Sequence, residues 1–126
     1  MITVLPVEDR VRLQELYVKE NQPLTDGAAA VEARDGEESL GYCLFAIGEG
    51  EITVTALTPA EDRFMADGVL RSALHVAVTR GIPAAYYAET APVELLACLG
   101  FIKNDENREL DIGKLFSSCQ NCGEDR

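Results

Sequence analysis

The chain has 126 residues, the length of one domain, and its 47% hydrophobic content is enough for a sizeable core. Its 22 acidic and 11 basic residues give a formal net charge of −11, and a surface this acidic repels phosphate backbones, which argues against a nucleic-acid partner. No run approaches the roughly 18 to 20 apolar residues of a membrane span, and the first residues lack the pattern of a signal peptide, so we expect a cytoplasmic protein with no membrane partner.

The first half of the chain predicts a strand, a helix and three further strands. A β-prone segment at residues 2–5 comes first, and Pro6 suits the first turn of the helix, with Glu8 and Asp9 at its positive end. An antiparallel meander follows, with turns that contain glycine between its strands. Its strands are predicted at residues 28–34, 40–47 and 51–57. The last of these alternates strictly between polar and apolar residues and is rich in β-branched residues, which makes it the clearest strand of the chain.

The second half predicts a long helix, a buried strand, a short helix and a hairpin. The long helix has an apolar face and is ended by Gly81 and Pro83. A strand on each side of such a helix implies a parallel crossover. The apolar face carries residues 69, 70, 73, 74 and 77, the buried strand spans 84–88, the short helix 92–99, and the hairpin strands 101–103 and 108–112.

Residues 1–113 are predicted to form the domain, and residues 114–126, which show little apolar periodicity, a mobile tail. The tail carries Cys119-x-x-Cys122, the spacing of half a zinc site or of a redox pair. A structural zinc needs four ligands and no second pair lies nearby in the sequence, so we predict no metal site. Cys43 and Cys98 lie in apolar runs and are predicted to be small core residues.

One motif stands between the strand at 51–57 and the long helix. Arg63-Phe64-Met65-Ala66-Asp67-Gly68 follows the spacing Arg/Gln-x-x-Gly-x-Gly/Ala, with alanine for the first glycine. Near the C-terminus, Leu99-Gly100-Phe101 is a second motif. In both motifs, and in the order strand, helix, three strands, helix, strand, helix, two strands, residues 1–113 resemble the GNAT N-acetyltransferases. The resemblance implies an α/β (α+β) fold with a mixed sheet, here with an abbreviated connection between the first helix and the second strand.

The resemblance also implies acetyl-CoA as the cofactor. Unpaired N–H groups at a helix N-terminus attract phosphates, small residues let the backbone approach, and an arginine adds a charge-assisted bond. The cofactor-binding residues would be Leu57, Thr58, Arg63, Phe64, Met65, Ala66, Asp67, Gly68 and Val69. The alternative is that Thr58-Pro59-Ala60-Glu61 is a capping box that starts the helix at Pro59 and leaves Arg63 on its surface.

For catalysis, some members of the family place a glutamate at the start of the fourth strand, and Glu51 resembles it as a general base. A solvated glutamate at a strand end is the alternative. Tyr86 and Tyr87 face opposite sides of their strand, so that one could serve as a proton donor in the cleft, or both could be core or surface aromatics. Leu96 and Glu89 stand where many members carry a tyrosine and an asparagine.

Three functions therefore compete. The first is an N-acetyltransferase that acts by direct transfer on a small-molecule or peptide amine, and a homodimer is left open. The second is a CoA-binding or regulatory module that has lost catalysis, which Leu96, Glu89 and Ala66 favour. The third is a metal- or redox-responsive interaction protein that acts through Cys119 and Cys122.

Overall fold

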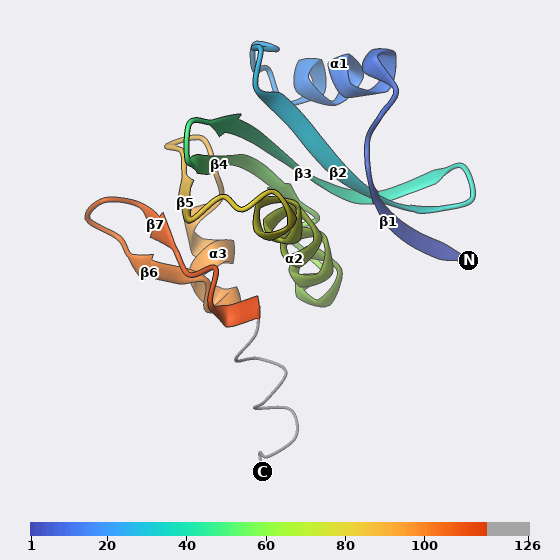
Figure 1. Ribbon diagram of the computed structural model, residues 1–126. Helices are drawn as coiled ribbons and strands as arrows, with labels where there is room; N and C mark the ends of the chain where they lie inside the picture. Colours follow the sequence, from blue (N-terminus) through green and yellow to red (C-terminus); the bar gives the residue numbers. More distant parts are fainter. Residues whose placement is uncertain (116–126) are drawn as a thin grey trace.

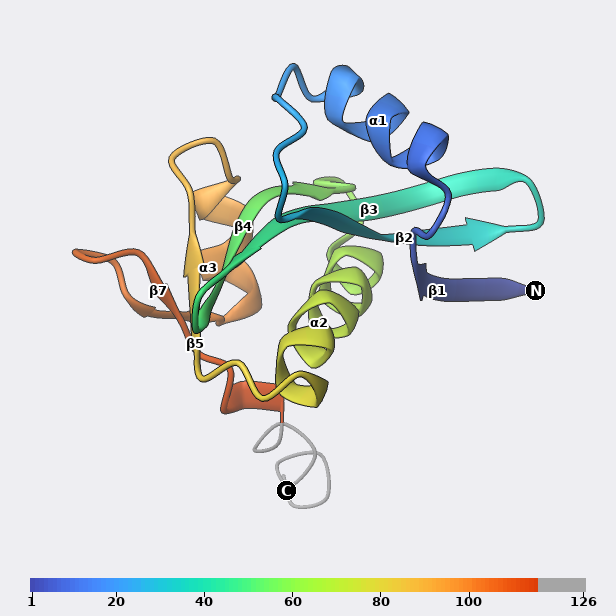
Figure 2. The same cartoon turned by 45° about the horizontal axis from the view of Figure 1, so that its top comes forward.

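The computed structural model describes residues 1–115, which form one seven-stranded mixed sheet in the order β1-β2-β3-β4-β5-β7-β6. Helix α1 lies on one face of the sheet and α2 and α3 lie on the other (Figures 1 and 2). The elements are β1 (Ile2–Pro6), α1 (Arg10–Lys19), β2 (Ala28–Asp35), β3 (Glu38–Gly48), β4 (Glu51–Thr58), α2 (Arg63–Thr79), β5 (Ala84–Tyr87), α3 (Val93–Leu99), β6 (Ile102–Asn104) and β7 (Glu109–Leu110). The predicted element order is confirmed.

The start of α1 differs from the prediction. Pro6 pairs with Val31 as the last residue of β1, and the helix begins only at Arg10. Proline is tolerated there because β1 is an edge strand, where a missing N–H costs no ladder hydrogen bond. Asp9 is the N-cap of α1 and accepts a hydrogen bond from the Val11 N–H at 3.0 Å. The prediction that Pro6 lies in the first turn of the helix is therefore wrong.

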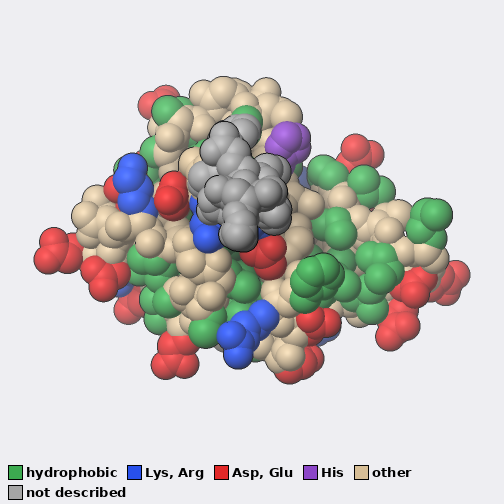
Figure 3. Space-filling model, turned by 90° about the horizontal axis from the view of Figure 1, so that it is seen from below, with side chains coloured by type: hydrophobic (Ala, Val, Ile, Leu, Met, Phe, Trp, Pro, Cys, Tyr) green, Lys and Arg blue, Asp and Glu red, His purple; other side chains and the backbone are tan. Residues whose placement is uncertain are grey.

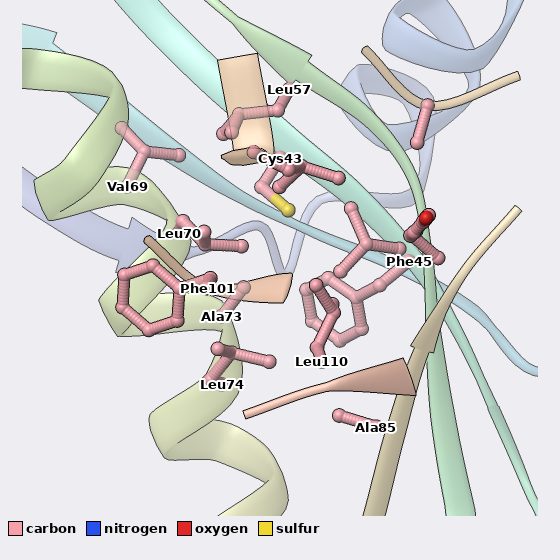
Figure 4. Packing of buried hydrophobic residues seen from close by; sticks show 14 of the residues in the cluster. Cys43, Phe45, Leu57, Val69, Leu70, Ala73, Leu74, Ala85, Phe101 and Leu110 are labelled. Atoms are coloured by element: carbon pink, nitrogen blue, oxygen red, sulfur yellow. The ribbon is translucent and has the colours of Figure 1, made fainter. Parts of the chain in front are cut away.

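The main core lies between the sheet and the α2 face of the molecule. Figure 4 shows Val69, Leu70, Ala73 and Leu74 of α2 directed towards side chains of the sheet. All five apolar positions predicted for this helix are fully buried. Phe101, the last residue of the second motif, is also fully buried, and its ring lies against the guanidinium of Arg71 at 5.1 Å. Burial of these groups supplies the main driving force that fixes α2 on the sheet.

Strand β4 contains a bulge that its sequence does not reveal. Leu44 of β3 pairs with Ala56, but the next residue, Phe45, pairs with Val54. Thr55 is therefore an extra residue on β4, and its hydroxyl donates a hydrogen bond to the Leu44 carbonyl at 3.3 Å. The predicted strict alternation of this strand is wrong at Thr55. Bulges bend a strand and raise its twist, so β4 turns at this point.

The parallel crossover is confirmed: β4 pairs with β5 in parallel and α2 connects them. The hairpin at the end of the domain is confirmed too, although β7 rather than β6 lies next to β5. Tyr86 of β5 is the residue paired with Glu109 of β7. The hairpin thus extends the sheet on the side of β5 that faces away from β4.

Cys43 and Cys98, which were both predicted to be core residues, lie in different environments. Cys43 is fully buried, and burial raises the pKa of its thiol. Cys98, in contrast, is exposed on α3, so its prediction as a core residue is wrong.

The packed structure continues beyond residue 113. Leu115 packs against the main core, and the Lys114 ammonium lies 5.8 Å from the Phe101 ring centre. The tail motif of Cys119 and Cys122 lies outside the described residues.

Two features bear on membranes and charge. None of the helices formed by residues 1–115 is long and apolar enough to cross a bilayer. On the face shown in Figure 3, acidic side chains are spread around the outline of the molecule rather than gathered in one patch.

Candidate functional site

The candidate site lies where β4 and β5 separate. The last pair of residues in this parallel ladder is Val54 and Tyr87, after which the Ala88 N–H donates to the Val54 carbonyl at 2.8 Å. Strand β4 continues to Thr58, and in Figure 2 it curves away from β5. The separation begins at the bulge. Because the bulge bends β4 at Thr55, the rest of β4 no longer runs alongside β5.

Two side chains from distant loops meet at the start of this separation. The Thr55 carbonyl accepts hydrogen bonds from the Thr90 hydroxyl at 2.9 Å and from the Gln22 amide at 3.1 Å. Thr90 comes from the connection between β5 and α3, and Gln22 from the connection between α1 and β2. Neither residue was singled out from the sequence, because a hydrogen bond to a bulge carbonyl has no sequence pattern of its own.

The N-terminus of α2 follows β4 after four residues. The helix begins at Arg63, and its N-cap is Asp62, whose side chain accepts the Met65 N–H at 3.1 Å. The N–H groups of Arg63 and Phe64 precede the first helical hydrogen bond, from Ala66 N–H to the Asp62 carbonyl, and stay unpaired within residues 1–115. These two donors and the positive end of the helix dipole form a place for an anion.

The alternative of a capping box at Thr58 is wrong. Thr58 is the last residue of β4, and its hydroxyl accepts a hydrogen bond from the Tyr42 N–H at 3.1 Å instead of capping a helix. The strand pairing with β3 holds Thr58 in extended backbone, so the helix starts later, at the next aspartate. Arg63 is therefore the first residue of α2, and not a residue further along a helix that begins at Pro59.

The structure divides the predicted cofactor-binding residues into two groups. Arg63 is exposed and Phe64 is 89% exposed, while Thr58, Met65, Asp67 and Gly68 are half-buried. Leu57, Ala66 and Val69 are buried in the main core. Ala66 is fully buried and its N–H donates to the Asp62 carbonyl, so this residue offers no free donor to a ligand. The Asp67 carboxylate forms an ion pair with Arg71, one turn further along the helix, at 2.7 Å.

Gly68 is the sixth residue of α2, and a Cβ added to it would meet no protein atom within 4 Å. Alanine there should stabilise the helix by about 0.5 to 1 kcal/mol, since glycine loses more backbone entropy. If a ligand lies over this turn, Gly68→Val should bind it at least tenfold more weakly while the protein stays folded. Thermal melting measures the first effect and titration with acetyl-CoA the second. Equal acetyl-CoA affinity in parent and Gly68→Val would show that the ligand does not approach this turn.

The three predicted catalytic residues lie in different environments. Glu51 is exposed at the first position of β4, three residues before Val54, which corresponds to about 10 Å along a strand. Tyr87 is buried in the main core on the α2 side, and Tyr86 is half-buried on the opposite face of the sheet. Of the three, Tyr86 therefore lies nearest to the separation of the strands on an accessible face. Leu96 is fully buried in the core.

A buried ionic network between α1 and β2 was not predicted from the sequence. Glu32 is the buried charged residue of the described core, and its carboxylate accepts two hydrogen bonds from Arg12, at 2.5 and 3.2 Å, and one from Ser39 at 2.7 Å. Burial acts to raise the pKa of Glu32, but the hydrogen bonds from Arg12 and Ser39 outweigh it and hold this pKa below its ordinary value. A glutamate between Val31 and Ala33 in an apolar strand was the available sign.

A second missed group fixes α1 and the loop that carries Gln22. The buried Tyr17 hydroxyl lies 2.9 Å from the Phe45 carbonyl and 3.0 Å from the Ala29 carbonyl, and it accepts the Ala29 N–H at 3.3 Å. Burial is the main cause of the raised pKa of Tyr17. The hydroxyl of Tyr42, also on this face, donates a hydrogen bond to the Glu20 carboxylate at the end of α1. These bonds hold the end of α1 on the sheet, and the connection that follows it brings Gln22 to the Thr55 carbonyl of β4.

Comparisons with known proteins rest on the structure, because the sequence matches no family model and no curated protein. The ribosomal-protein-S18-alanine N-acetyltransferase from Escherichia coli superposes with a TM-score of 0.57, at 14% identity, over 86% of this chain and 88% of that one. The chain has the GNAT fold. A solution structure of YhhK from E. coli, a presumed N-acetyltransferase bound to coenzyme A, has a TM-score of 0.48, at 19% identity, over 82% of this chain and 93% of that one.

The predicted fold class is thereby confirmed. Within the GNAT fold of this chain, the first motif occupies the first two turns of α2 rather than a loop in front of it. The second motif ends α3 through Gly100, whose φ of 81° is the left-handed conformation that glycine adopts without strain. Both motifs therefore have a structural role in this fold besides any role towards a ligand.

Proposed function

We propose that this chain is an acetyl-CoA-dependent N-acetyltransferase that transfers the acetyl group directly to an amine. The observation that carries the proposal is the separation of β4 from β5 at Thr55, followed by an α2 N-terminus where the Arg63 and Phe64 N–H groups have no partner among residues 1–115. An extended pantetheine arm fits between separating strands, and a pyrophosphate fits the positive end of a helix. The exposed Arg63 guanidinium would add a charge-assisted bond to the same phosphates.

Phe64 supports the same placement. An aromatic ring that is 89% exposed at the second position of the helix stands beside the proposed phosphate site. Such a ring offers a stacking surface to a purine base. We therefore place the adenine of the cofactor against Phe64, the pyrophosphate at the first turn of α2 and the thioester near Thr55. A backbone N–H of β4 near Leu57 would polarise the thioester carbonyl.

Binding of acetyl-CoA is the first test. At a hundredfold excess over its dissociation constant the cofactor should stabilise the fold by about 2.7 kcal/mol, seen as a rise in melting temperature of several degrees. Asp62→Asn should increase the rise, because asparagine caps a helix as well as aspartate does but carries no charge against the phosphates. Pantetheine, which lacks the pyrophosphate, should give a much smaller shift at the same concentration.

The opposite outcome is also clear. If millimolar acetyl-CoA leaves the melting temperature of the folded parent unchanged, the cofactor proposal is wrong. If pantetheine stabilises the protein as much as acetyl-CoA does, the cofactor binds without the α2 N-terminus, and Asp62→Asn should then have no effect.

A GNAT-like module that binds acyl-CoA without catalysis is the second candidate. Leu96 favours it, because this position is fully buried in the core and holds no group that could protonate a leaving thiolate. Release of free CoA thiol in the presence of a panel of amines distinguishes the two functions. A parent protein that binds acetyl-CoA but releases no thiol with any amine would be the binding module.

A further inference from the structure

A row of three half-buried side chains crosses the sheet just before the strands separate. Thr53 of β4 pairs with Tyr86 of β5, and Tyr86 pairs with Glu109 of β7. Paired residues on adjacent strands lie on one face, with Cβ atoms about 4.5 to 5.5 Å apart across an antiparallel pair. The row Thr53–Tyr86–Glu109 is therefore continuous across the three strands. One residue further along β4 and β5, Val54 and Tyr87 form the last pair before these strands separate.

Burial of the neighbours fixes which face carries the row. Ile52 and Val54, on either side of Thr53, belong to the main core under α2, as do Tyr87 next to Tyr86 and Leu110 next to Glu109. Since successive residues of a strand point to opposite faces, Thr53, Tyr86 and Glu109 all lie on the α1 face.

Helix α1 leaves this part of the sheet open. The hydrophobic cluster under α1 draws on β2 and β3 and takes only Ala56 from β4. Figures 1 and 2 agree with this arrangement: α1 lies over β2 and β3, and β5 and β7 lie beyond it. The row is consequently accessible from solvent on the α1 face, while the cofactor is proposed to reach the separation from the α2 N-terminus. A second substrate could approach the thioester from the α1 face.

The Glu109 carboxylate is partly exposed and is held by a long ion pair. The Glu109 side chain is 28% exposed and its nearest ionic partner is the Lys103 ammonium at 3.7 Å, a distance at the edge of an ion pair. Two further titratable groups of β4 and β5 lie on this face: Tyr86, beside Glu109, and Glu51, two residues before Thr53. An ammonium placed over Tyr86 would face both carboxylates, with Glu109 in the same row as the phenol.

We propose that Glu109 binds the ammonium of the acceptor and is its general base, an inference that rests on the proposed acetyltransferase function. The substrate class is a primary amine that is protonated at neutral pH. Glu109 takes one proton from R–NH₃⁺, and the free amine attacks the thioester carbonyl carbon. The C–N bond forms, the C–S bond breaks, and the second proton of the nitrogen passes to the CoA thiolate, directly or through the Tyr86 hydroxyl. Glu109 then releases its proton to solvent.

Glu109→Gln tests the proposal, with Glu106→Gln as the matched control, because Glu106 is an exposed glutamate of the same hairpin. The probes are putrescine, an alkyl diamine protonated at pH 7, and 4-methoxyaniline, whose nitrogen is already neutral there; thiol release is measured. Loss of a positioned base costs about 10²- to 10⁴-fold in rate. We expect a loss of this size in kcat/KM for putrescine with Glu109→Gln, a much smaller loss for 4-methoxyaniline, and none with Glu106→Gln.

The pH dependence adds a readout that a structural role would not move. With putrescine the deficit of Glu109→Gln should shrink as the pH rises towards the pKa of the amine, because the substrate then needs no base. Melting curves and acetyl-CoA titration of the variant should match those of the parent. A parent that is active while Glu109→Gln keeps full activity at neutral pH would overturn the assignment alone. A parent that acetylates none of a wide amine panel would overturn the acetyltransferase function and this assignment with it.

Discussion

Arg12→Met is expected to destabilise the protein by about 3 kcal/mol, because removing one partner of a buried ion pair leaves an uncompensated charge. The Glu32 side chain is 3% exposed and Arg12 supplies two of its hydrogen bonds. We take the lower end of the usual range because the Arg12 side chain is itself 28% exposed. Methionine keeps the length of the side chain over the sheet. Urea denaturation at pH 7 measures the loss.

The effect should depend on pH with a definite sign. The pKa of Glu32 is lowered in the fold, so its ionic contribution is complete above the unfolded pKa, about 4.3, and is lost as the pH falls through the lower folded value. The stability difference between parent and Arg12→Met should therefore be large at pH 7 and shrink in acid. Arg34→Met is the control, because Arg34 lies 3.6 Å from Glu32 and is 37% exposed. If Arg34→Met lowers the free energy of unfolding as much as Arg12→Met does, Arg12 is not the main ionic partner of Glu32.

Gly41→Ala is the second substitution with a large expected effect. A Cβ on Gly41 would lie 2.6 Å from the Thr58 carbonyl oxygen and 2.6 Å from Cδ of Pro59. Neither atom belongs to a flexible side chain, so the end of β4 would have to move, at a cost of about 3 kcal/mol. Since this segment leads into α2, the variant should also lose affinity for acetyl-CoA. Chemical denaturation and the acetyl-CoA melting shift measure the two effects.

Gly48→Ala is the matched control on the same strand. An added Cβ there meets only Cγ of Glu51 at 3.7 Å, an ordinary contact. This control should change stability by less than about 0.5 kcal/mol. If Gly41→Ala is tolerated equally well, the loop after β4 is free to adjust, and the tight approach of β3 to Thr58 is not what positions the α2 N-terminus.

The elements of the fold could be predicted because each has a local cause in the sequence. Apolar periodicity defines α2, β-branched alternation defines β4, and Gly100 ends α3. The errors occur where a distant contact decides. Pro6 stays in a strand because it pairs with Val31, and Thr58 does not cap a helix because it pairs with Tyr42. Neither pairing can be derived from the residues next to it.

The site could be predicted only in part, for the same reason. The motif from Arg63 to Gly68 has a fixed spacing and could be found in the sequence. Glu109 could not, because its place beside Tyr86 depends on the hairpin inserting β7 between β5 and β6. Glu51 carries the right chemistry at a strand end. However, β4 and β5 stay paired from Glu51 to Val54 and separate only at the bulge at Thr55.

The bulge at Thr55 also has an evolutionary consequence. Because it adds one residue to β4 relative to β3, Ala56 faces α1 and Leu57 faces α2. Deleting Thr55 would place Val54 next to Ala56 and restore regular pairing with β3, so Ala56 and Leu57 would keep their faces. The bend that separates β4 from β5 would be lost, and with it the carbonyl that holds Thr90 and Gln22. Homologues that use this separation as a site should therefore keep a residue of any type at position 55, and a gap there should mark a relative that has kept the fold without the site.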